Sequence, residues 1–418
     1  MVEVKKDTFP DGTVIDEWFF DVKMPTLNDF GKQYVITNYG VLQDGKTHTQ
    51  EFQNLIDLVS ENGGGVIVVP SGIFYTGALF FKKGVNLYIE EGATLKASDD
   101  ISDYPVCDTR IEGECCKYYP ALINADGIDG FTLCGKGTID GNGLRSWKAF
   151  WQRRAWNPNC TNKDEQRARL VFLSNCNNAL IAGLTMQNSQ FWTNHIYKCN
   201  RVKFVGLNIF SPREPVLAPS TDAIDIDVCS DVLIKNCYME VNDDGVALKG
   251  GKGPWADENP QNGINQRILV EDCVYGFCHS AITCGSESVH NKNVLVRRLK
   301  VNGILQLIHF KLRPDTPQIY EYITVENVQG EITGSFININ PWTQFFDLKG
   351  RTDKPLSTAR NITVKNCNCN CEVFFNVSKS QDYLLKDFCL QNIEVKVNNE
   401  ENGYLAVENL NLDNVKVN

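Results

Sequence analysis

A right-handed parallel β-helix, an all-β solenoid with a short N-terminal capping helix, is the fold that the sequence predicts. A short segment in which apolar and polar residues alternate recurs along most of the chain, and its copies end near Asn-Cys or Gly-Leu pairs. Val, Ile and Thr dominate these segments, which is typical of strands rather than helices. One amphipathic helical segment precedes the copies. We therefore expect coils of short strands that stack behind a helical cap.

The capping helix is expected at residues 49–61. Phe52, Leu55, Ile56 and Val59 follow the i, i+3, i+4, i+7 spacing of one apolar helix face. Such a face would cover the open apolar end of the solenoid. The predicted organisation is a single β-helix domain over residues 1–418, with an N-terminal extension and cap over about 1–65 and stacked coils with loop insertions over about 66–418.

The repeated segments start at residues 178, 201, 231, 267, 293, 322, 361, 387 and 409. Successive copies lie 22 to 39 residues apart, a base period that insertions lengthen. Each copy is expected to form one coil, with Asn and Cys residues stacked in ladders between coils. The longer gaps predict loops at residues 211–219 and 250–260. The aromatic and basic segment 147–156 is expected to be a surface loop whose Trp residues suit stacking on sugar rings.

Composition excludes some classes of function. The 418 residues carry a formal charge of −10, which argues against a nucleic-acid-binding protein. No run approaches the roughly 20 apolar residues that cross a membrane. A solenoid with shielded ends is expected to be a monomer.

Cysteines and the N-terminus bear on the compartment. The 16 Cys mostly lie in strand-like surroundings and are expected to be free and buried, and the spacings around Cys115 and Cys367 do not match a standard zinc site. The first residues have no apolar core of a secretory signal. A cytoplasmic location is therefore expected, with a secreted or periplasmic one if a signal had been removed.

Three acidic residues carry the strongest local signal for chemistry. Asp243 follows Asp222 by 21 residues, about one coil, and Asp244 comes next. Since adjacent rungs lie ~4.8 Å apart, the three carboxyl groups are expected to share one patch. Crowded like charges raise at least one pKa, which lets one group act as an acid and another as a base. A calcium site or a structural ladder of Asp turns is the alternative interpretation.

Basic residues occur at about the same phase of neighbouring coils. His279 lies between short residues, Lys311 and Arg313 stand two apart on one face of an extended segment, and Lys249 follows the Asp pair. Cations gathered around an acidic centre suit a carboxylate on the substrate. A structural histidine and a solvated basic pair are the alternatives.

Taken in order, these residues carry a resemblance to a known family. The segments Ser220-Thr-Asp222, Asp243-Asp244, Cys278-His-Ser280 and Lys311-Leu-Arg313 correspond to the motifs N-T-D, D-D, G-H-G and R-I-K. The sequence thereby resembles the polygalacturonase family, glycoside hydrolase family 28, whose members degrade pectin. Residues 137–143 and 188–195 are also similar, and the resemblance runs from about residue 35 to near the end.

The resemblance implies a glycosidase that hydrolyses an α-glycosidic bond with inversion at the anomeric carbon. Asp243 would be the general acid, Asp222 and Asp244 would activate the water, and acid and base would stand ~6.5–9.5 Å apart. His279 would support the acid or the sugar. Residues implied in substrate binding are Lys311, Arg313, Lys249, Trp192 and His195. No metal or other cofactor would be needed.

Several positions depart from the family pattern: Ser220 replaces Asn, Ala223 replaces Gly, Cys278 and Ser280 replace Gly, and the basic pair is reversed. These departures leave galacturonan, rhamnogalacturonan and xylogalacturonan open as substrates. Long loops around residues 145–165, 211–219 and 250–262 would close one end of a groove. We therefore expect an exo-acting enzyme that releases terminal galacturonic acid from pectic oligo- or polysaccharides.

Two other functions fit the same fold. A pectate-lyase-like enzyme would use Ca²⁺ and an Arg base, and its activity would depend on the metal and produce a 4,5-unsaturated sugar. A non-catalytic β-helix would bind polysaccharide, and Asp243→Asn would leave its function unchanged.

Overall fold

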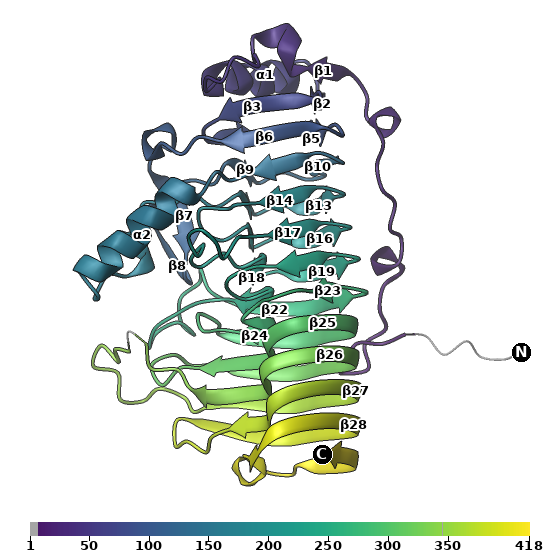
Figure 1. Cartoon of the computed structure of the whole chain (residues 1–418), viewed down its shortest axis with the longest axis vertical. Coiled ribbons are helices and arrows are strands. Elements are labelled where there is room, and N and C mark those ends of the chain that lie inside the picture. Colours follow the sequence, from purple (N-terminus) through teal and green to yellow (C-terminus); the bar gives the residue numbers. More distant parts are fainter. Residues whose placement is uncertain (1–6, 345) are drawn as a thin grey trace, which may run out of the picture.

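The computed structural model describes residues 7–344 and 346–418, whose chain winds into a tall solenoid of parallel strands (Figure 1). Three ladders of strands run along its axis, and each strand pairs with its counterpart in the next coil. This is the right-handed parallel β-helix that the sequence predicted.

The short strands belong to one ladder each. The first ladder contains β1 Gln33–Val35, β2 Gly65–Val69, β5 Val85–Ile89, β10 Thr132–Gly135, β13 Asn177–Ala182, β16 Asn200–Val205, β19 Ser230–Lys235 and β22 Ile264–Glu271. The second contains β3 Gly72–Thr76, β6 Ala93–Ala97, β11 Thr138–Asp140, β14 Thr185–Gln187, β17 Asn208–Phe210, β20 Tyr238–Glu240 and β23 Val274–Tyr275. The third contains β4 Leu79–Phe81, β9 Ile123–Asp126, β12 Val171–Ser174, β15 Asn194–Tyr197, β18 Ile224–Asp227, β21 Val246–Lys249 and β24 Ser280–Cys284.

Longer strands form the C-terminal coils: β25 His290–Leu312, β26 Ile319–Pro341, β27 Ser357–Val377, β28 Tyr383–Asn402 and the shorter β29 Asn411–Val417. The long strands bend around the corners of the coil at single residues with positive φ, such as Asn293 at 57° and Asn361 at 55°. Asn tolerates this left-handed conformation better than most residues, so many Asn side chains serve the corners.

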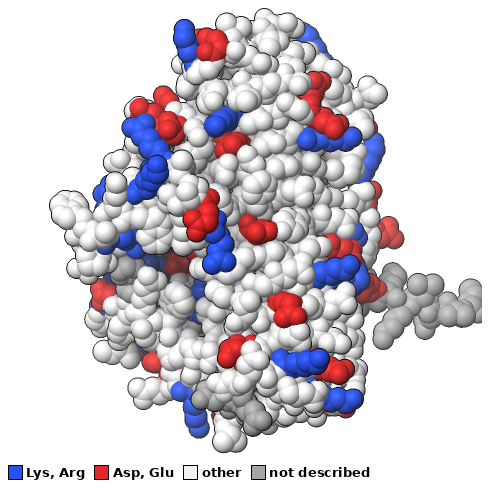
Figure 2. Space-filling view, in the orientation of Figure 1, with Lys and Arg blue, Asp and Glu red and all other residues white. Residues whose placement is uncertain are grey.

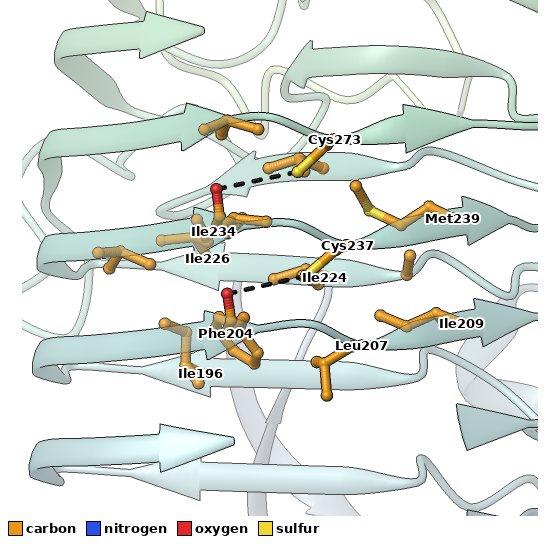
Figure 3. Close-up of a cluster of buried hydrophobic side chains, with 14 of the residues drawn as sticks. Ile196, Phe204, Leu207, Ile209, Ile224, Ile226, Ile234, Cys237, Met239 and Cys273 are labelled. Carbon is orange, nitrogen blue, oxygen red and sulfur yellow. Dashed lines mark hydrogen bonds between the residues drawn. The ribbon is translucent and has the colours of Figure 1, made fainter. Parts of the chain in front are cut away.

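The core is a set of vertical stacks inside the coils. In the third ladder Ile196, Ile226, Leu248, Cys284 and Phe310 succeed one another in register, and none of them has more than 1% of its surface exposed. Figure 3 shows two further stacks side by side, one with Ile234 above Phe204 and one with Cys273 above Cys237.

The expected cysteine ladders are present, and all 16 cysteines are free. The Cys176 amide donates to Cys199 Sγ at 3.4 Å, and the Cys199 amide to Cys229 Sγ at 3.3 Å. Thiols also donate to carbonyls of the preceding coil, as Cys237 does to Phe204 and Cys273 to Ile234 (Figure 3). These thiols are therefore small core side chains rather than metal ligands.

The N-terminal part covers one end and one side of the solenoid. Helix α1, Thr49–Glu61, lies across the end (Figure 1) and buries Phe52, Leu55, Ile56 and Val59, as its apolar spacing predicted. Before it, residues 7–30 run along the outside of the coils. There Phe9, Ile15 and Phe19 pack against side chains that point outward from the first ladder: Leu233, Leu269 and Leu295.

Short 3-10 helices punctuate the connections: η1 Glu17–Phe19, η2 Leu27–Asp29, η3 Ile36–Tyr39, η4 Ile101–Asp103, η5 Asn162–Asp164 and η6 Tyr404–Ala406. Charged side chains are dispersed over the face seen in Figure 2, where no continuous basic patch occurs.

Two excursions leave the coils on the side of the third ladder (Figure 1). The antiparallel pair β7 Cys107–Ile111 and β8 Glu114–Tyr118 forms a hairpin, which the sequence did not predict. The segment expected as a loop at 147–156 is instead helical, as part of α2, Leu144–Trp156. Only a short face of this helix is buried, through Trp147 and Phe150, whereas Trp156 is 87% exposed. The loop prediction is wrong because only one turn of the helix has an apolar face for the pattern to reveal.

Candidate active site

The three predicted acids meet at the amino ends of strands in the third ladder. Asp222 precedes β18, and Asp243 and Asp244 precede β21. The register of these strands pairs Ile224 with Val246, so Asp222 and Asp244 occupy equivalent positions on adjacent rungs. Oxygen atoms of the three carboxyl groups lie within 4.8 Å of one another. The expected carboxyl patch is therefore present.

Backbone hydrogen bonds fix the three acids. The Thr193 amide donates to the Asp222 carbonyl at 2.8 Å, and the Ala223 amide to the Asp244 carbonyl at 3.0 Å. The His279 amide donates to the Asp243 carbonyl at 2.8 Å. Regular stacking thus places the acids, since the same bonds recur from coil to coil.

The three acids differ in exposure. The side chain of Asp243 is 26% exposed, whereas those of Asp222 and Asp244 are 3% and 1% exposed. Asp243 is therefore the carboxyl group that a ligand can reach directly. The two buried carboxyl groups lie behind it.

Asp244 is held as a carboxylate. Lys311 Nζ lies 2.6 Å from its Oδ2, and the Ser280 hydroxyl donates to its Oδ1 at 2.9 Å. Burial alone would raise the pKa of Asp244, but the charges of Lys311 and Lys249 outweigh it and hold this pKa below its ordinary value. Ser280, which stands where the family motif has Gly, is thus a hydrogen-bond donor to the site.

Asp222 is held in the opposite state. Burial, together with the negative charges of Asp243 and Asp225, raises the pKa of Asp222 well above its ordinary value. Its surroundings therefore favour the protonated form of Asp222 next to Asp244, whose ionised form is favoured. Because the groups are so close, a proton bound by Asp222 is shared with the cluster rather than held by one carboxyl group.

Lys249 is the centre of a second ionic network. Its Nζ lies 3.7 Å from Asp222, 3.5 Å from Asp225 and 3.5 Å from Glu287, and it lies 4.8 Å from the centre of the Trp192 ring. Burial alone would lower the pKa of Lys249, but the surrounding acidic groups, above all Glu287, raise it well above its ordinary value. Lys249 is therefore positively charged and helps to position the acidic side chains around it.

His279 adjoins the exposed acid. Its Nδ1 lies 3.3 Å from Asp243 Oδ1, and 42% of its side chain is exposed. Burial alone would lower the pKa of His279, but its hydrogen bond to Asp243 outweighs this effect and raises the pKa. The predicted proximity of His279 to the acids is found in the structure.

Around the acids lies a pocket of about 270 Å³. All but one of the residues singled out from the sequence line it: Asp222, Asp243, Asp244, His279, Lys249, Lys311, Arg313 and Trp192. Its volume is slightly below the ~300–1,000 Å³ of drug-sized ligand pockets, which suits a small terminal unit of a polymer.

His195 is the residue that the structure does not bring into the pocket. Its ring is fully buried, with Nδ1 2.6 Å from Arg169 and Nε2 3.4 Å from Asp227. Burial lowers the pKa of His195 to about 4, so the ring is neutral. Direct contact with a substrate is therefore not available to it, and it supports Trp192, whose ring centre lies 5.1 Å away.

The basic pair also differs from the expected arrangement. Arg313 binds the carboxylate of Asp315 through Nε and Nη2, both at 2.7 Å, while Lys311 binds Asp244. Both cations line the pocket, but each has a carboxylate partner within the chain. The sequence could not reveal these pairings because they depend on side-chain directions at the end of β25.

Several lining residues were not identified from the sequence. They are Glu112 of the β7–β8 turn, Phe150 and Arg154 of α2, Asn162, Lys252, Ser286, Glu287, Trp342 and Gln344. Lys252 belongs to one of the loops that the long repeat gaps predicted, and α2 contains the aromatic and basic segment 147–156 that was expected to be a surface loop. Glu112 carried no such signal, because nothing in its local sequence indicates which coil it reaches.

The three acids also form the group of described residues with the spacing to hold a metal ion. Lys311 and Lys249 already supply positive charge at 2.6 Å and 3.7 Å from two of them. Two lysines of the chain itself therefore compensate the negative charge of these carboxyl groups.

Comparison with known proteins identifies the family. The sequence model of glycosyl hydrolases family 28 matches residues 67–334, which include the three acids and both basic residues of β25 and its end. The chain belongs to glycosyl hydrolase family 28. The resemblance inferred from the four motifs is confirmed.

Family 28 relatives are found across plants and bacteria. The chain is 30% identical over 245 residues to the "Probable polygalacturonase" of Vitis vinifera, covering 56% of this chain and 47% of the relative. It is 27% identical over 228 residues to an exopolygalacturonase of Zea mays, covering 53% of this chain and 50% of the relative. The chain thus spans about half the length of these curated relatives.

The fold agrees with solved family 28 structures. The crystal structure of a hyperthermoactive exopolygalacturonase from Thermotoga maritima has a TM-score of 0.71 to this chain at 21% identity, covering 95% of each chain. At this identity the likeness establishes the shared β-helix.

The expected cytoplasmic location is wrong. The polygalacturonases that this family 28 chain resembles are secreted, extracellular or periplasmic enzymes that act on pectin outside the cytoplasm. Among the described residues, the helices are too short or too polar to span a membrane.

Proposed function

We propose that this chain is an inverting glycoside hydrolase that acts on pectic oligo- and polysaccharides and releases terminal galacturonic acid. Residues 1–418 would form one catalytic β-helix domain. The observation that carries the proposal is a cluster of three carboxyl groups within 4.8 Å of one another in one pocket, where the surroundings lower the pKa of Asp244 and raise that of Asp222. Glycoside hydrolysis requires this combination of acid and base.

Asp243 is the proposed general acid. It is the exposed member of the cluster, and His279 holds it in place at 3.3 Å. It would protonate the oxygen of the leaving sugar with a proton that it shares with Asp222.

Asp244 is the proposed base that activates the water, and Asp222 would share this role once the cluster has given up its proton. The nearest oxygens of the cluster lie within 4.8 Å of one another. The ~6.5–9.5 Å expected for an inverting pair refers to whole carboxyl groups and stays a prediction. Burial favours inversion. A nucleophilic carboxylate must touch the anomeric carbon, and the 1% exposed Asp244 is accessible to water rather than to a sugar ring.

The exo mode of action has support from the shape of the pocket and from the relatives. Helix α2, the turn of the β7–β8 hairpin and the loop that carries Lys252 all contribute to the lining, which would obstruct a polymer from running through. The relatives from Zea mays and Thermotoga maritima are named exopolygalacturonases.

The experiment is the product profile from polygalacturonic acid, short oligogalacturonides and rhamnogalacturonan fragments. Wild type should release monosaccharide from the first time point. Asp243→Asn should lower kcat by about 10³-fold or more while the melting temperature stays within a few degrees, because one acid–base group contributes about 10²–10⁴-fold. Equal activity of Asp243→Asn would remove this acid from the mechanism, and early release of long oligomers would contradict the exo mode.

A further inference from the structure

The positive groups of the pocket differ in whether the chain itself neutralises them. Five Lys and Arg residues line the pocket: Arg154, Lys249, Lys252, Lys311 and Arg313. Four of them have carboxylates nearby. Arg154 lies 3.4 Å from Glu165, and the partners of Lys249, Lys311 and Arg313 are described above.

Lys252 is the exception. No carboxylate of residues 7–344 or 346–418 whose side chain is described lies within 4.0 Å of its ammonium group. The nearby Glu287 is already engaged, since it lies 3.5 Å from Lys249 and accepts from the Ser286 hydroxyl at 2.6 Å. The charge of Lys252 still contributes to lowering the pKa of Glu287, but its ammonium group forms no ion pair within 4.0 Å among the described residues, so it can bind an anionic ligand.

The loop that carries Lys252 is held in place. The Gly253 amide donates to the Thr316 hydroxyl at 3.0 Å, and Arg351 binds both the Pro254 carbonyl and Asp257, the latter at 2.7 Å. A Cβ on Gly251 would lie 2.4 Å from the Asn262 side chain, so the backbone there is closely packed. The ammonium group is thus presented from a fixed base, which lowers the entropic cost of binding.

We propose that Lys252 is the residue that binds the carboxylate of the substrate and selects a uronic acid over a neutral sugar. This inference rests on the proposed function and names a specificity-determining residue for it. Lys311 and Arg313, which the resemblance implied for this task, instead hold Asp244 and Asp315. The carboxylate of a terminal unit would bind Lys252, which among the described Lys and Arg residues of the pocket lies outside these ion pairs.

The test compares substrates that differ only in charge. Lys252→Met removes the charge and keeps the length of the side chain. On a galacturonate trisaccharide with free carboxylates, this variant should raise KM by about 10- to 100-fold, the effect of losing a charge-assisted hydrogen bond. On the same trisaccharide with methyl-esterified carboxylates, KM should change by less than about twofold.

The matched control is Lys349→Met. Lys349 is an exposed cation whose charge affects the same neighbour, Lys163, as that of Lys252, but it does not line the pocket. It should leave both KM values unchanged at moderate salt, because exposed charges are screened. Equal effects of Lys252→Met on the free and esterified substrates, or no effect on either, would overturn the inference.

Binding separates this inference from the proposed function. Calorimetry with the inactive Asp243→Asn protein should detect binding of the trisaccharide with free carboxylates. Adding Lys252→Met to this protein should raise Kd by the same 10- to 100-fold factor, about one to two decades. If wild type cleaves nothing but this Lys252-dependent affinity exists, the proposed function fails and the inference stands. If wild type cleaves and the affinity does not depend on Lys252, the inference alone fails. Absence of both cleavage and binding overturns both.

Discussion

Lys311 decides the protonation state of the proposed base. It contributes the ammonium group 2.6 Å from Asp244 inside a site where both side chains are almost fully buried. In such surroundings an ion pair is partly desolvated, and removing one partner leaves an uncompensated charge. The charge of Asp244 therefore depends on a residue that is 67 positions away in sequence.

Lys311→Met should consequently move the acid limb of the pH profile of kcat/KM to higher pH. With Lys311, the folded pKa of Asp244 lies below its unfolded value, so the pair stabilises the fold above about pH 4 and loses this contribution as pH falls through the folded pKa. Without it, the pKa of Asp244 rises, and the free energy of unfolding at pH 7 should fall by about 3–5 kcal/mol. Urea titrations and pH–rate profiles measure both effects. Lys311→Arg keeps the charge and should show a smaller shift, whereas an unmoved acid limb in Lys311→Met would contradict the assignment of Asp244.

Asp225 has the opposite effect on the free energy of unfolding. Both of its carboxyl oxygens are buried without a hydrogen-bond partner, and burial raises its pKa to about 8. When the pKa of a carboxyl group is higher in the folded protein than in the unfolded chain, the free energy of unfolding falls as the pH rises from the lower pKa to the higher one. The reason is that only the unfolded chain ionises in that range.

Asp225→Asn should therefore stabilise the protein at neutral pH. We expect a gain of about 1–3 kcal/mol at pH 7 that largely vanishes near pH 3, where the carboxyl group is mostly neutral in both states. Lys249 retains Asp222 and Glu287 as partners. Chemical denaturation at the two pH values checks the gain, and a loss of stability at pH 7 would mean that the Asp225–Lys249 pair is net favourable.

Helix α1 illustrates how one element protects the solenoid. Its buried face covers the end of the first coils, where strand edges and core side chains would otherwise meet water. A solenoid requires such a cap because each coil is completed only by its neighbour.

Ile56→Ala should lower the free energy of unfolding by about 2–5 kcal/mol, since it empties a fully buried position. Leu58→Ala on the same helix is the matched control. Leu58 is 38% exposed, so its removal should cost less than about 1 kcal/mol. Urea-induced unfolding followed by circular dichroism measures both variants, and equal losses would argue against a capping role for the buried face.

Elements outside the period of the coils shape the pocket. Helix α2 and the β7–β8 hairpin project from the third ladder (Figure 1) and contribute Phe150, Arg154 and Glu112 to the lining. The sequence indicated an excursion near α2 but not its helical form, because most of this helix faces solvent or a neighbouring loop. Loop-borne residues of this kind set which substrates a conserved scaffold accepts.

At the scale of the whole molecule, the stereochemistry of the product tests the arrangement of the acids. Direct attack by water on an α-linked sugar inverts the anomeric carbon, so the β-anomer of the released sugar should form first and then mutarotate. Proton NMR during the first minutes of hydrolysis distinguishes it from the α-anomer that retention would give. Initial α-anomer would mean that a carboxylate reaches the sugar carbon.

The same reaction mixtures separate hydrolysis from elimination. The positive charge beside the acids comes from Lys311 and Lys249, so a chelator should leave the rate unchanged within about 20%, in contrast to sites whose charge a bound cation supplies. No product with the ultraviolet absorbance of a 4,5-unsaturated sugar should accumulate. A chelator-sensitive rate with such a product would favour the lyase interpretation.

The sequence by itself determined the solenoid and the meeting of Asp222, Asp243 and Asp244. Each coil repeats the same alternation of apolar and polar residues, so local strand geometry and the spacing of 21 residues are enough to place these acids on adjacent rungs.

Only the tertiary structure decided which charges neutralise one another and which residues wall the pocket. The pairs Lys311–Asp244 and Arg313–Asp315 depend on side-chain directions, and the buried position of His195 depends on Arg169 and Asp227 packing around it. Glu112 and Lys252 reach the pocket on segments that leave the coils, where the periodic spacing no longer relates sequence to position. Stacking makes the acids predictable from spacing, whereas loop paths and ionic pairing arise only when distant segments pack together.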